Sequence, residues 1–179
     1  MSGARTLETR TVWAGPTLRV EVDRVRLPNG ETSELEVVHH PGATAVVPLR
    51  EDGMVLLVRQ YRHAVGDWLL EVPAGKLSLG EEPEACARRE LEEEAGVRAA
   101  TLHPLGAIWM TPGFCDERIW LFLATGLSEG EQRLERDEVL RVERLPLAEA
   151  ERLAMEGGIQ DAKSICAILR AARATASGR

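Results

Sequence analysis

Residues 75–97 of this chain read GKLSLGEEPEACARRELEEEAGV. Little more than one helical turn of this stretch holds one arginine and four glutamates: Arg89, Glu90, Glu92, Glu93 and Glu94. Like charges three or four residues apart on a helix repel by roughly 0.2–0.5 kcal/mol per pair. The crowding therefore gains the fold nothing unless a positive charge settles among the carboxylates, and a divalent metal ion is the natural candidate.

The end signals of a helix surround this cluster. Pro83 suits a first helical position, and Gly96 suits the position that follows the last turn. The helix between them carries a narrow apolar stripe that can pack on a sheet: Ala87, Leu91 and Ala95. The sequence thus predicts a helix with one apolar face and one acidic face.

The carboxylates divide between two directions on this helix. At about 100° per residue, Glu90, Glu93 and Glu94 share one face, whereas Glu92 points the opposite way, toward solvent. Carboxylate oxygens suit hard cations such as magnesium, manganese or calcium rather than zinc. A charged run is usually a solvated helix face, so the metal interpretation needs support from the spacing.

The spacing supplies that support. The stretch fits the pattern G-x5-E-x7-R-E-U-x-E-E-x-G-U, where U is a bulky aliphatic residue, at every fixed position: Gly75, Glu81, Arg89, Glu90, Leu91, Glu93, Glu94, Gly96 and Val97. This pattern resembles the Nudix box. The resemblance implies a hydrolase that cleaves a pyrophosphate linkage in a nucleoside diphosphate attached to another group.

The resemblance also implies roles for single residues. It makes Glu93 part of the catalytic group, and it assigns the ligands of Mg²⁺, with Mn²⁺ as a substitute, to Glu90, Glu93, Glu94 and the backbone carbonyl of Ala74. Arg89 is then no ligand. Its implied partner is Glu81, and the pair holds the loop that begins at Gly75 against the helix and so orients the ligands.

Substrate class has to be sought outside the box. Residues 57–75, LVRQYRHAVGDWLLEVPAG, resemble the ADP-ribose pyrophosphatase branch of the family. By this resemblance Arg59 and Arg62 lie near the site, and Arg62 is the better candidate for contacting the substrate. Arginine matches phosphate oxygens at two points or stacks on a base. The alternative is a pair of solvent-exposed arginines at a strand end.

A second segment points to the same branch. Residues 109–117 read WMTPGFCDE, and Pro112 follows Gly96 by sixteen residues, which is the spacing of ADP-ribose-type members. By matching position, Thr111 and Glu117 touch the terminal ribose or its phosphate. The alternative is an ordinary Pro-Gly turn.

The reaction also requires a proton acceptor for the attacking water. In the resembled enzymes this acceptor is a glutamate on a downstream loop, which corresponds here to residues 128–138, SEGEQRLERDE. The candidates are Glu138, which comes just before the next predicted strand, and Glu135. A charged loop with few apolar residues can close over a substrate.

Composition indicates one soluble protein. At 179 residues and 44% hydrophobic content the chain can bury about 70% of its unfolded surface. Three cysteines and no signal-like apolar run favour a reducing cytoplasm and exclude a membrane location. A net charge of -7 argues against nucleic acid as a partner. The partner that the resemblance implies is a small-molecule nucleoside diphosphate.

The predicted fold is α/β, a Nudix-type α/β/α sandwich around a mixed β-sheet, preceded by antiparallel strands. Residues 1–40 are expected to form this N-terminal β region and residues 41–179 the Nudix hydrolase domain. Apolar runs on either side of residues 51–53 predict a hairpin. In the resembled enzymes the N-terminal sheet exchanges across a homodimer and supplies part of the adenine pocket, to which Arg26 would contribute.

Two other functions stay open. Ser78 replaces a frequent acid, and Trp109 with Met110 makes the pocket entry bulkier, so the substrate can instead be FAD, NADH or GDP-mannose. A Nudix-like module that binds ADP-ribose without hydrolysing it is the alternative outside enzymes. Its mark would be the loss of box carboxylates, and none is lost here.

Overall fold

The computed structural model describes residues 3–136 and 138–177 of the chain. The chain divides into two compact units, of which the first holds residues 1–42 and 109–118 and the second holds residues 43–108 and 119–179. The structure thus assigns residues 109–118 to the unit of the N-terminal strands. In the described ranges no helix has the length and apolar character needed to cross a membrane.

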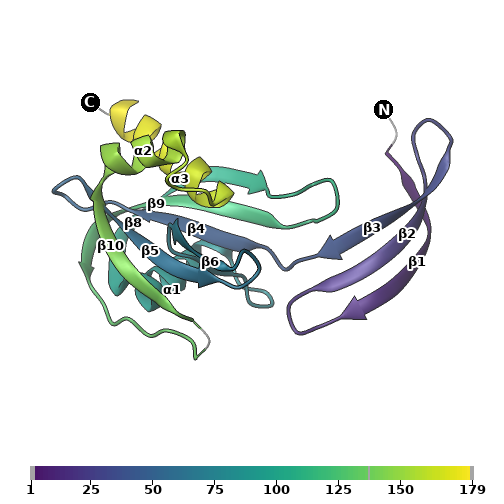
Figure 1. The fold of residues 1–179 in the computed structure, drawn as a ribbon, viewed down its shortest axis with the longest axis horizontal. Coiled ribbons are helices and arrows are strands. Elements are labelled where there is room, and N and C mark those ends of the chain that lie inside the picture. The colour runs from purple at the N-terminus through teal and green to yellow at the C-terminus, as the bar shows by residue number, and fades with distance from the viewer. Residues whose placement is uncertain (1–2, 137, 178–179) are drawn as a thin grey trace. The chain divides into compact units, whose positions relative to one another are not determined.

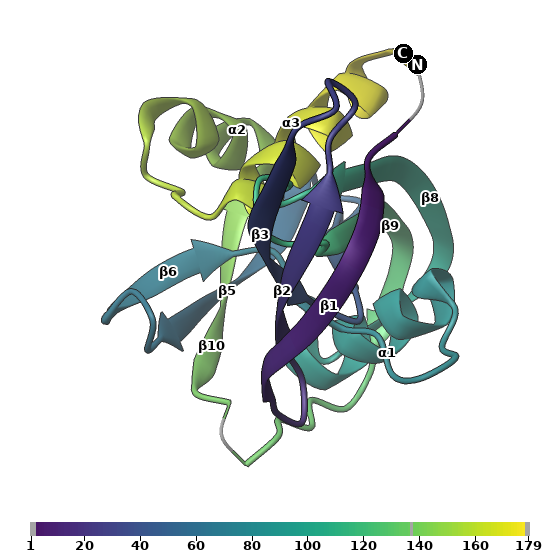
Figure 2. The same cartoon turned by 90° about the vertical axis from the view of Figure 1, so that its right-hand side faces the viewer.

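The first unit is built on a three-stranded antiparallel sheet in the order β1-β2-β3, formed by Arg5–Ala14, Arg19–Arg26 and Thr32–His39. Figure 2 shows these strands side by side. A turn at residues 28–30 connects β2 to β3, with Gly30 at a φ of 91°. Val38 makes an isolated bridge to Cys115, which attaches residues 109–118 to β3.

The second unit contains two sheets. One has the order β10-β5-β6, from Leu140–Pro146, Met54–Arg62 and Asp67–Glu71. The other has the order β7-β4-β9-β8, from Ala74–Lys76, Ala43–Pro48, Arg118–Glu129 and Val97–Trp109. This second sheet is mixed, because β4 pairs parallel with β9 and antiparallel with β7.

Helices flank these sheets on both sides, as Figure 1 shows for α1 and for the α2–α3 pair. The helices are α1 (Pro83–Ala95), α2 (Leu147–Glu156) and α3 (Ala162–Ser177). The apolar stripe of α1 is buried against both sheets in a core whose members include Val46, Leu56, Phe122 and Ala124. The predicted α/β/α sandwich around a mixed sheet is therefore confirmed.

Two local predictions have different outcomes. The box helix begins at Pro83 and ends at Ala95, and Gly96 closes it in the left-handed conformation at a φ of 65°, as predicted. The hairpin at residues 51–53 was wrong in its pairing. The turn exists, but β4 and β5 share only the isolated bridge from Leu49 to Val55 and then enter different sheets.

Candidate active site

A two-point ion pair fixes the start of the box helix. Arg89 donates from Nε to Oε1 and from Nη2 to Oε2 of Glu81, at 3.0 Å in both cases. The backbone N–H of Ser78 donates to the same carboxylate at 2.9 Å. The hydrogen bonds from Arg89 lower the pKa of Glu81 to about 2. The loop after Gly75 is therefore attached to α1, and the expected partner of Arg89 is the observed one.

Arg89 also faces the acidic side of the helix. Its Nη1 lies 2.6 Å from Oε1 of Glu90 and 3.0 Å from Oε2 of Glu93. Glu90 is only 6% exposed, and burial raises its pKa to about 7 despite Arg89, with the charges of Glu93 and Glu138 adding to the rise. One guanidinium is thus shared by several carboxylates, and it does not fully offset the cost of burying the negative charge of Glu90.

The buried negative charge of Glu94 is offset even less by nearby cations. It is 2% exposed, and its Oε2 accepts a hydrogen bond of 2.8 Å from the backbone N–H of Ala74. Burial raises its pKa to about 8, and the charges of Glu90 and Glu138 contribute to the same rise. Burial of these two neighbouring carboxyls therefore outweighs the positive charge near them, in keeping with the crowding of glutamates in the sequence.

Gly75 has a steric role at this site. A Cβ added there would lie 2.0 Å from both Cδ and Oε1 of Glu90, which is far inside van der Waals contact. The carboxyl group of Glu90 therefore occupies the space that any other residue at position 75 would fill. This close approach explains why the first position of the box is glycine.

The donor set fits a hard divalent cation. It consists of oxygen atoms only, and the raised pKa values of Glu90 and Glu94 show that added positive charge would stabilise them as anions. Among residues 3–136 and 138–177, no three acidic, histidine or cysteine side chains already stand together as a metal site. Arg89 instead bonds Glu90 and Glu93.

The charged loop that carries the base candidates Glu135 and Glu138 is attached to the end of α1. The backbone N–H of Gly130 donates to Gly96 O and that of Arg133 to Glu93 O, both at 2.9 Å. The side-chain amide of Gln132 donates to the carbonyl of Glu94 at 2.6 Å. These bonds satisfy carbonyls that a helix end leaves unpaired. Gln132 was not among the predicted site residues, although it is the amide side chain of a loop rich in charged residues.

The two base candidates differ in their surroundings. The charge of Glu138 acts on both Glu90 and Glu94, so Glu138 lies on the acidic side of α1. Glu135 contributes its backbone N–H, which donates to Oε2 of Glu138 at 2.8 Å. Of the two candidates, Glu138 is the one whose charge contributes to the raised pKa values of Glu90 and Glu94.

Arg62 belongs to a second cluster. Its Nε and Nη2 donate to the two oxygens of Glu71 at 2.7 and 2.6 Å. The charge of Glu94 also acts on Arg62, which places its guanidinium near the box carboxylates. Lys163 is a further partner of Glu71. Neither Glu71 nor Lys163 was among the predicted site residues, and Lys163 lies in the first turn of α3.

Arg59 points to a different neighbour. It donates from Nε and Nη2 to Glu143 of the adjacent strand β10, at 2.7 and 3.1 Å. With Trp68, Leu140 and Arg141 it lines a small pocket. Arg59 is thus bound to the sheet, and the structure does not bring it together with the box carboxylates as it does Arg62.

Three predicted substrate contacts belong to the first unit. Arg26 is exposed at the end of β2, where it pairs in register with Thr32 of β3 and Arg5 of β1. The carbonyl of Thr111 accepts from the N–H groups of Phe114 and Cys115, which forms a turn. The carboxylate of Glu117 lies 3.6 Å from Nδ1 of His40.

One prediction about the box helix needs correction. Glu92 was expected to point freely into solvent, but its side chain is only 17% exposed and lies 2.6 Å from Nη2 of Arg98. Arg98 follows the helix in β8, so the pair connects α1 to the next strand. Glu92 remains away from the shared face of the other carboxylates.

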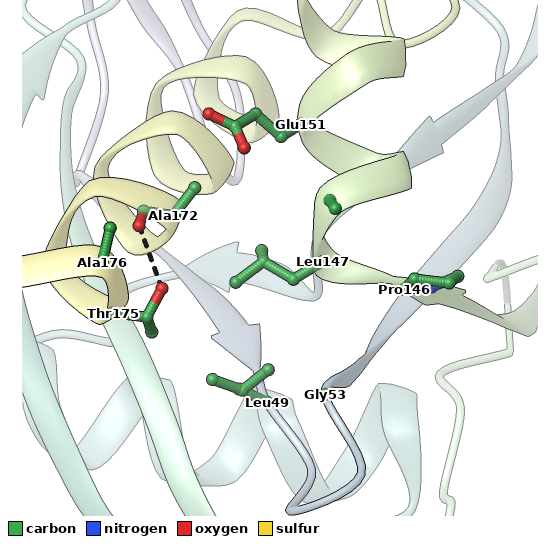
Figure 3. Close-up of a pocket in the computed structure, with 9 residues that line it drawn as sticks. Leu49, Gly53, Pro146, Leu147, Glu151, Ala172, Thr175 and Ala176 are labelled. Carbon is green, nitrogen blue, oxygen red and sulfur yellow. Dashed lines mark hydrogen bonds between the residues drawn. The ribbon is translucent and has the colours of Figure 1, made fainter. Parts of the chain in front are cut away.

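Figure 3 shows a pocket between α2 and α3 that contains none of the predicted site residues. It is largely apolar and has a volume of about 570 Å³. Leu49, Leu147 and Ala172 contribute to its lining, and the Thr175 hydroxyl is bonded to the carbonyl of Ala172 at 2.9 Å. The pocket lining has no residue in common with the carboxylate cluster of α1.

Comparison with known proteins agrees with this geometry. The sequence matches the family described as NUDIX domain over residues 38–167. A methanol dehydrogenase activator of Bacillus methanolicus and an ADP-ribose pyrophosphatase of Bacillus subtilis (strain 168) are each 40% identical over 166 residues, 92% of this chain and 90% of each relative. A crystal structure of an ADP compounds hydrolase superposes with a TM-score of 0.85 at 24% identity, covering 99% of this chain and 96% of that chain. This last likeness supports the fold.

Proposed function

The chain belongs to the NUDIX domain family, and from this premise we propose that it hydrolyses the pyrophosphate bond of ADP-ribose to give AMP and ribose 5-phosphate. One observation carries the proposal. The ADP-ribose pyrophosphatase of Bacillus subtilis (strain 168) aligns with nine tenths of this chain, and the chain retains every fixed position of the box. This intact box also argues against a module that only binds ADP-ribose.

The proposed cofactor is Mg²⁺, for which Mn²⁺ can substitute. The carboxylates of Glu90, Glu93 and Glu94 and the carbonyl of Ala74 would hold it, and the poorly compensated buried carboxyls support this assignment. When bound, the ion supplies charge stabilisation of the pyrophosphate and activation of the attacking water. Arg89, anchored on Glu81, keeps the carboxylates in place and stays outside the ligand set.

Glu138 is the proposed general base, with Glu135 as the alternative and Glu93 as part of the same catalytic group. A base needs a carboxylate that faces the reacting atoms, and the charge of Glu138 reaches both buried box glutamates. The N–H of Glu135 orients that carboxylate. Gln132 and its neighbours hold the loop against α1, so the base keeps its place relative to the ligands.

Five residues are proposed as substrate contacts. Arg62 is the main phosphate contact, because its guanidinium lies near Glu94 and is held by Glu71. The remaining proposed contacts are Arg59, Thr111, Glu117 and Arg26. Homodimerisation through the first unit is proposed as well, supported by large apolar side chains exposed on its strands: Leu7, Val12, Trp13 and Leu35.

The proposed location is the cytoplasm. All three cysteines are free in the structure, and free thiols suit a reducing compartment. Neither nucleic acid nor membrane is a proposed partner.

The test is a substrate panel with Mg²⁺: ADP-ribose, FAD, NADH, GDP-mannose and dGTP. We expect ADP-ribose to give the highest kcat/KM, with AMP and ribose 5-phosphate as products. The panel matters because a relative with the same identity bears a different name, methanol dehydrogenase activator. A higher kcat/KM for another dinucleotide or sugar nucleotide would transfer the assignment to that substrate, and equal rates would reject the claimed selectivity.

A further inference from the structure

A buried network of charges lies outside the box. Its centre is Glu71, which is 1% exposed at the end of β6. Both carboxylate oxygens of Glu71 are bonded by Arg62, and Oε2 also accepts a hydrogen bond from Nζ of Lys163. Burial alone would raise the pKa of Glu71, but Arg62 and Lys163 outweigh burial and hold this pKa below its ordinary value. Glu71 is therefore a buried anion held between two cations.

Lys163 connects this anion to the start of α3. Its ammonium also bonds Oδ2 of Asp161 at 2.9 Å. Asp161 caps the helix by accepting from the N–H of Ser164 at 3.0 Å, and the hydroxyl of Ser164 accepts from the N–H of Val72 at 2.9 Å. The network thus fixes the end of β6 to the first turn of α3 through residues distant in sequence.

The charges of this network balance. Two cations, Arg62 and Lys163, face two carboxylates, Glu71 and Asp161. Lysine is rarely buried, and Lys163 is only 8% exposed. Without its ammonium, Arg62 alone would face both carboxylates. If the ammonium of Lys163 were absent, the guanidinium of Arg62 would be attracted by both carboxylates and would turn away from a bound ligand.

Arg62 has one edge left for such a ligand. Nε and Nη2 are used by Glu71, whereas no bond from Nη1 to another residue is seen within the described part of the chain. The side chain is 38% exposed. A planar guanidinium that is held at two points presents its remaining N–H groups in a fixed direction.

We propose that Lys163 is a positioning residue for substrate binding: acting through Glu71, it holds Arg62 in the orientation in which its free edge meets a phosphate of the substrate. This inference rests on the proposed hydrolysis of ADP-ribose. Lys163 itself does not touch the substrate. Its ammonium completes the charge balance that leaves Arg62 available.

The test compares Lys163→Met with wild type in steady-state hydrolysis of ADP-ribose with Mg²⁺. We expect KM to rise about tenfold while kcat stays within about twofold, because the contact acts on ground state and transition state alike. Lys163→Arg, which keeps the charge, should recover most of the affinity. Arg152→Met is the matched control, since Arg152 also bonds two carboxylates, Glu149 and Glu156, but on the exposed face of α2; its KM should equal that of wild type.

A double-variant cycle separates positioning from general damage. In an Arg62→Met background, Lys163→Met should leave KM unchanged, because the residue through which it acts is gone. An equal rise of KM in both backgrounds, or a wild-type KM for Lys163→Met, overturns the proposal. If Lys163→Met does not fold, Lys163→Gln takes its place in the cycle under the same criteria. Wild-type protein without turnover of ADP-ribose would reject the proposed function itself, which the wild-type measurement reveals separately.

Discussion

Two clusters of this molecule share one motif, an arginine that binds a glutamate at two points, and they differ in charge balance. In the box, Arg89 binds Glu81 and is the direct partner of two more carboxylates, while Glu94 stands beside them. In the second cluster, Arg62 binds Glu71, and Lys163 and Asp161 complete equal numbers of positive and negative groups.

This difference in charge balance indicates that the buried charges of the two clusters have different functions. The box raises the pKa of its buried glutamates to about 7 and 8, so it is built to receive further positive charge. The second cluster lowers the pKa of Glu71 and needs no addition. A cluster with more carboxylates than cations suits the binding of a metal ion. A cluster with equal numbers of carboxylates and cations suits the fixed orientation of one side chain.

The strongest test of this contrast is metal removal. EDTA treatment should lower hydrolysis by at least about 10³-fold, because the ion supplies several kcal/mol of transition-state stabilisation, and added Mg²⁺ should restore it. Mg²⁺ should also raise the Tm of wild type and of Lys163→Met, but not that of a Glu90→Gln, Glu94→Gln double variant. Undiminished turnover in metal-free protein would contradict the interpretation of the box.

Replacement of the loop glutamates comes next in expected effect. Glu138→Gln should lower kcat by about 10²–10⁴-fold, because the variant cannot accept a proton. Glu135→Gln should stay near wild type, since Glu135 reaches Glu138 through its backbone N–H, which the substitution keeps. Single-turnover rates measure both. A reversed order would move the base to Glu135, and near-wild-type rates in both variants would remove the loop from the chemistry.

Gly75→Ala tests whether the absence of a side chain at position 75 is needed to keep the carboxyl group of Glu90 in place. The new Cβ would stand 2.0 Å from the carboxyl group of Glu90 and displace it, so Mg²⁺ affinity should fall by about 10–100-fold. The Tm should change by only about 2–4 °C, because the displaced group is the end of a flexible side chain. Titration of activity with Mg²⁺ gives the affinity. Gly3→Ala, where an added Cβ meets nothing within 4 Å, is the control, and equal affinities would refute the steric role.

The smallest expected effect is the acid sensitivity of the Arg89–Glu81 pair. The pKa of Glu81 is lowered from 4.5 to about 2, so its stabilisation is present above pH 4.5 and is lost as the pH falls toward 2. The pair is partly exposed and is worth about 0.2–1 kcal/mol. The Tm of wild type should exceed that of Glu81→Gln near neutral pH, and the gap should narrow on acidification. A constant gap would show that the pair adds no pH-dependent stability.

The two clusters also differ in how far the sequence predicts them. Glu81 and Arg89 stand eight residues apart and join one loop to one helix, and the resemblance to the Nudix box implied this pair. Glu71 and Lys163 lie 92 residues apart. Nothing local indicates that these two residues meet, because their contact requires α3 to be packed beside the end of β6.

The same division holds for the fold. Gly96 ends α1 as its position after the last turn indicated. The antiparallel strands of the N-terminal region were predicted, but the partner of β4 was not. The turn at residues 51–53 implied a hairpin, yet β4 pairs with β9, whose partner residues lie 76 positions further along the chain.

The sequence by itself determined the box helix and its acidic face, because both depend on spacings within a few helical turns, and its resemblance to the Nudix box implied the Arg89–Glu81 pair and the family. Only the tertiary structure decided that Arg59 is bound to Glu143, that Arg62 and Lys163 are both bonded to Glu71, and that the N–H of Glu135 donates to the carboxylate of Glu138. Those choices depend on burial and on contacts between distant segments, and such contacts exist only after the sheets and helices have packed together.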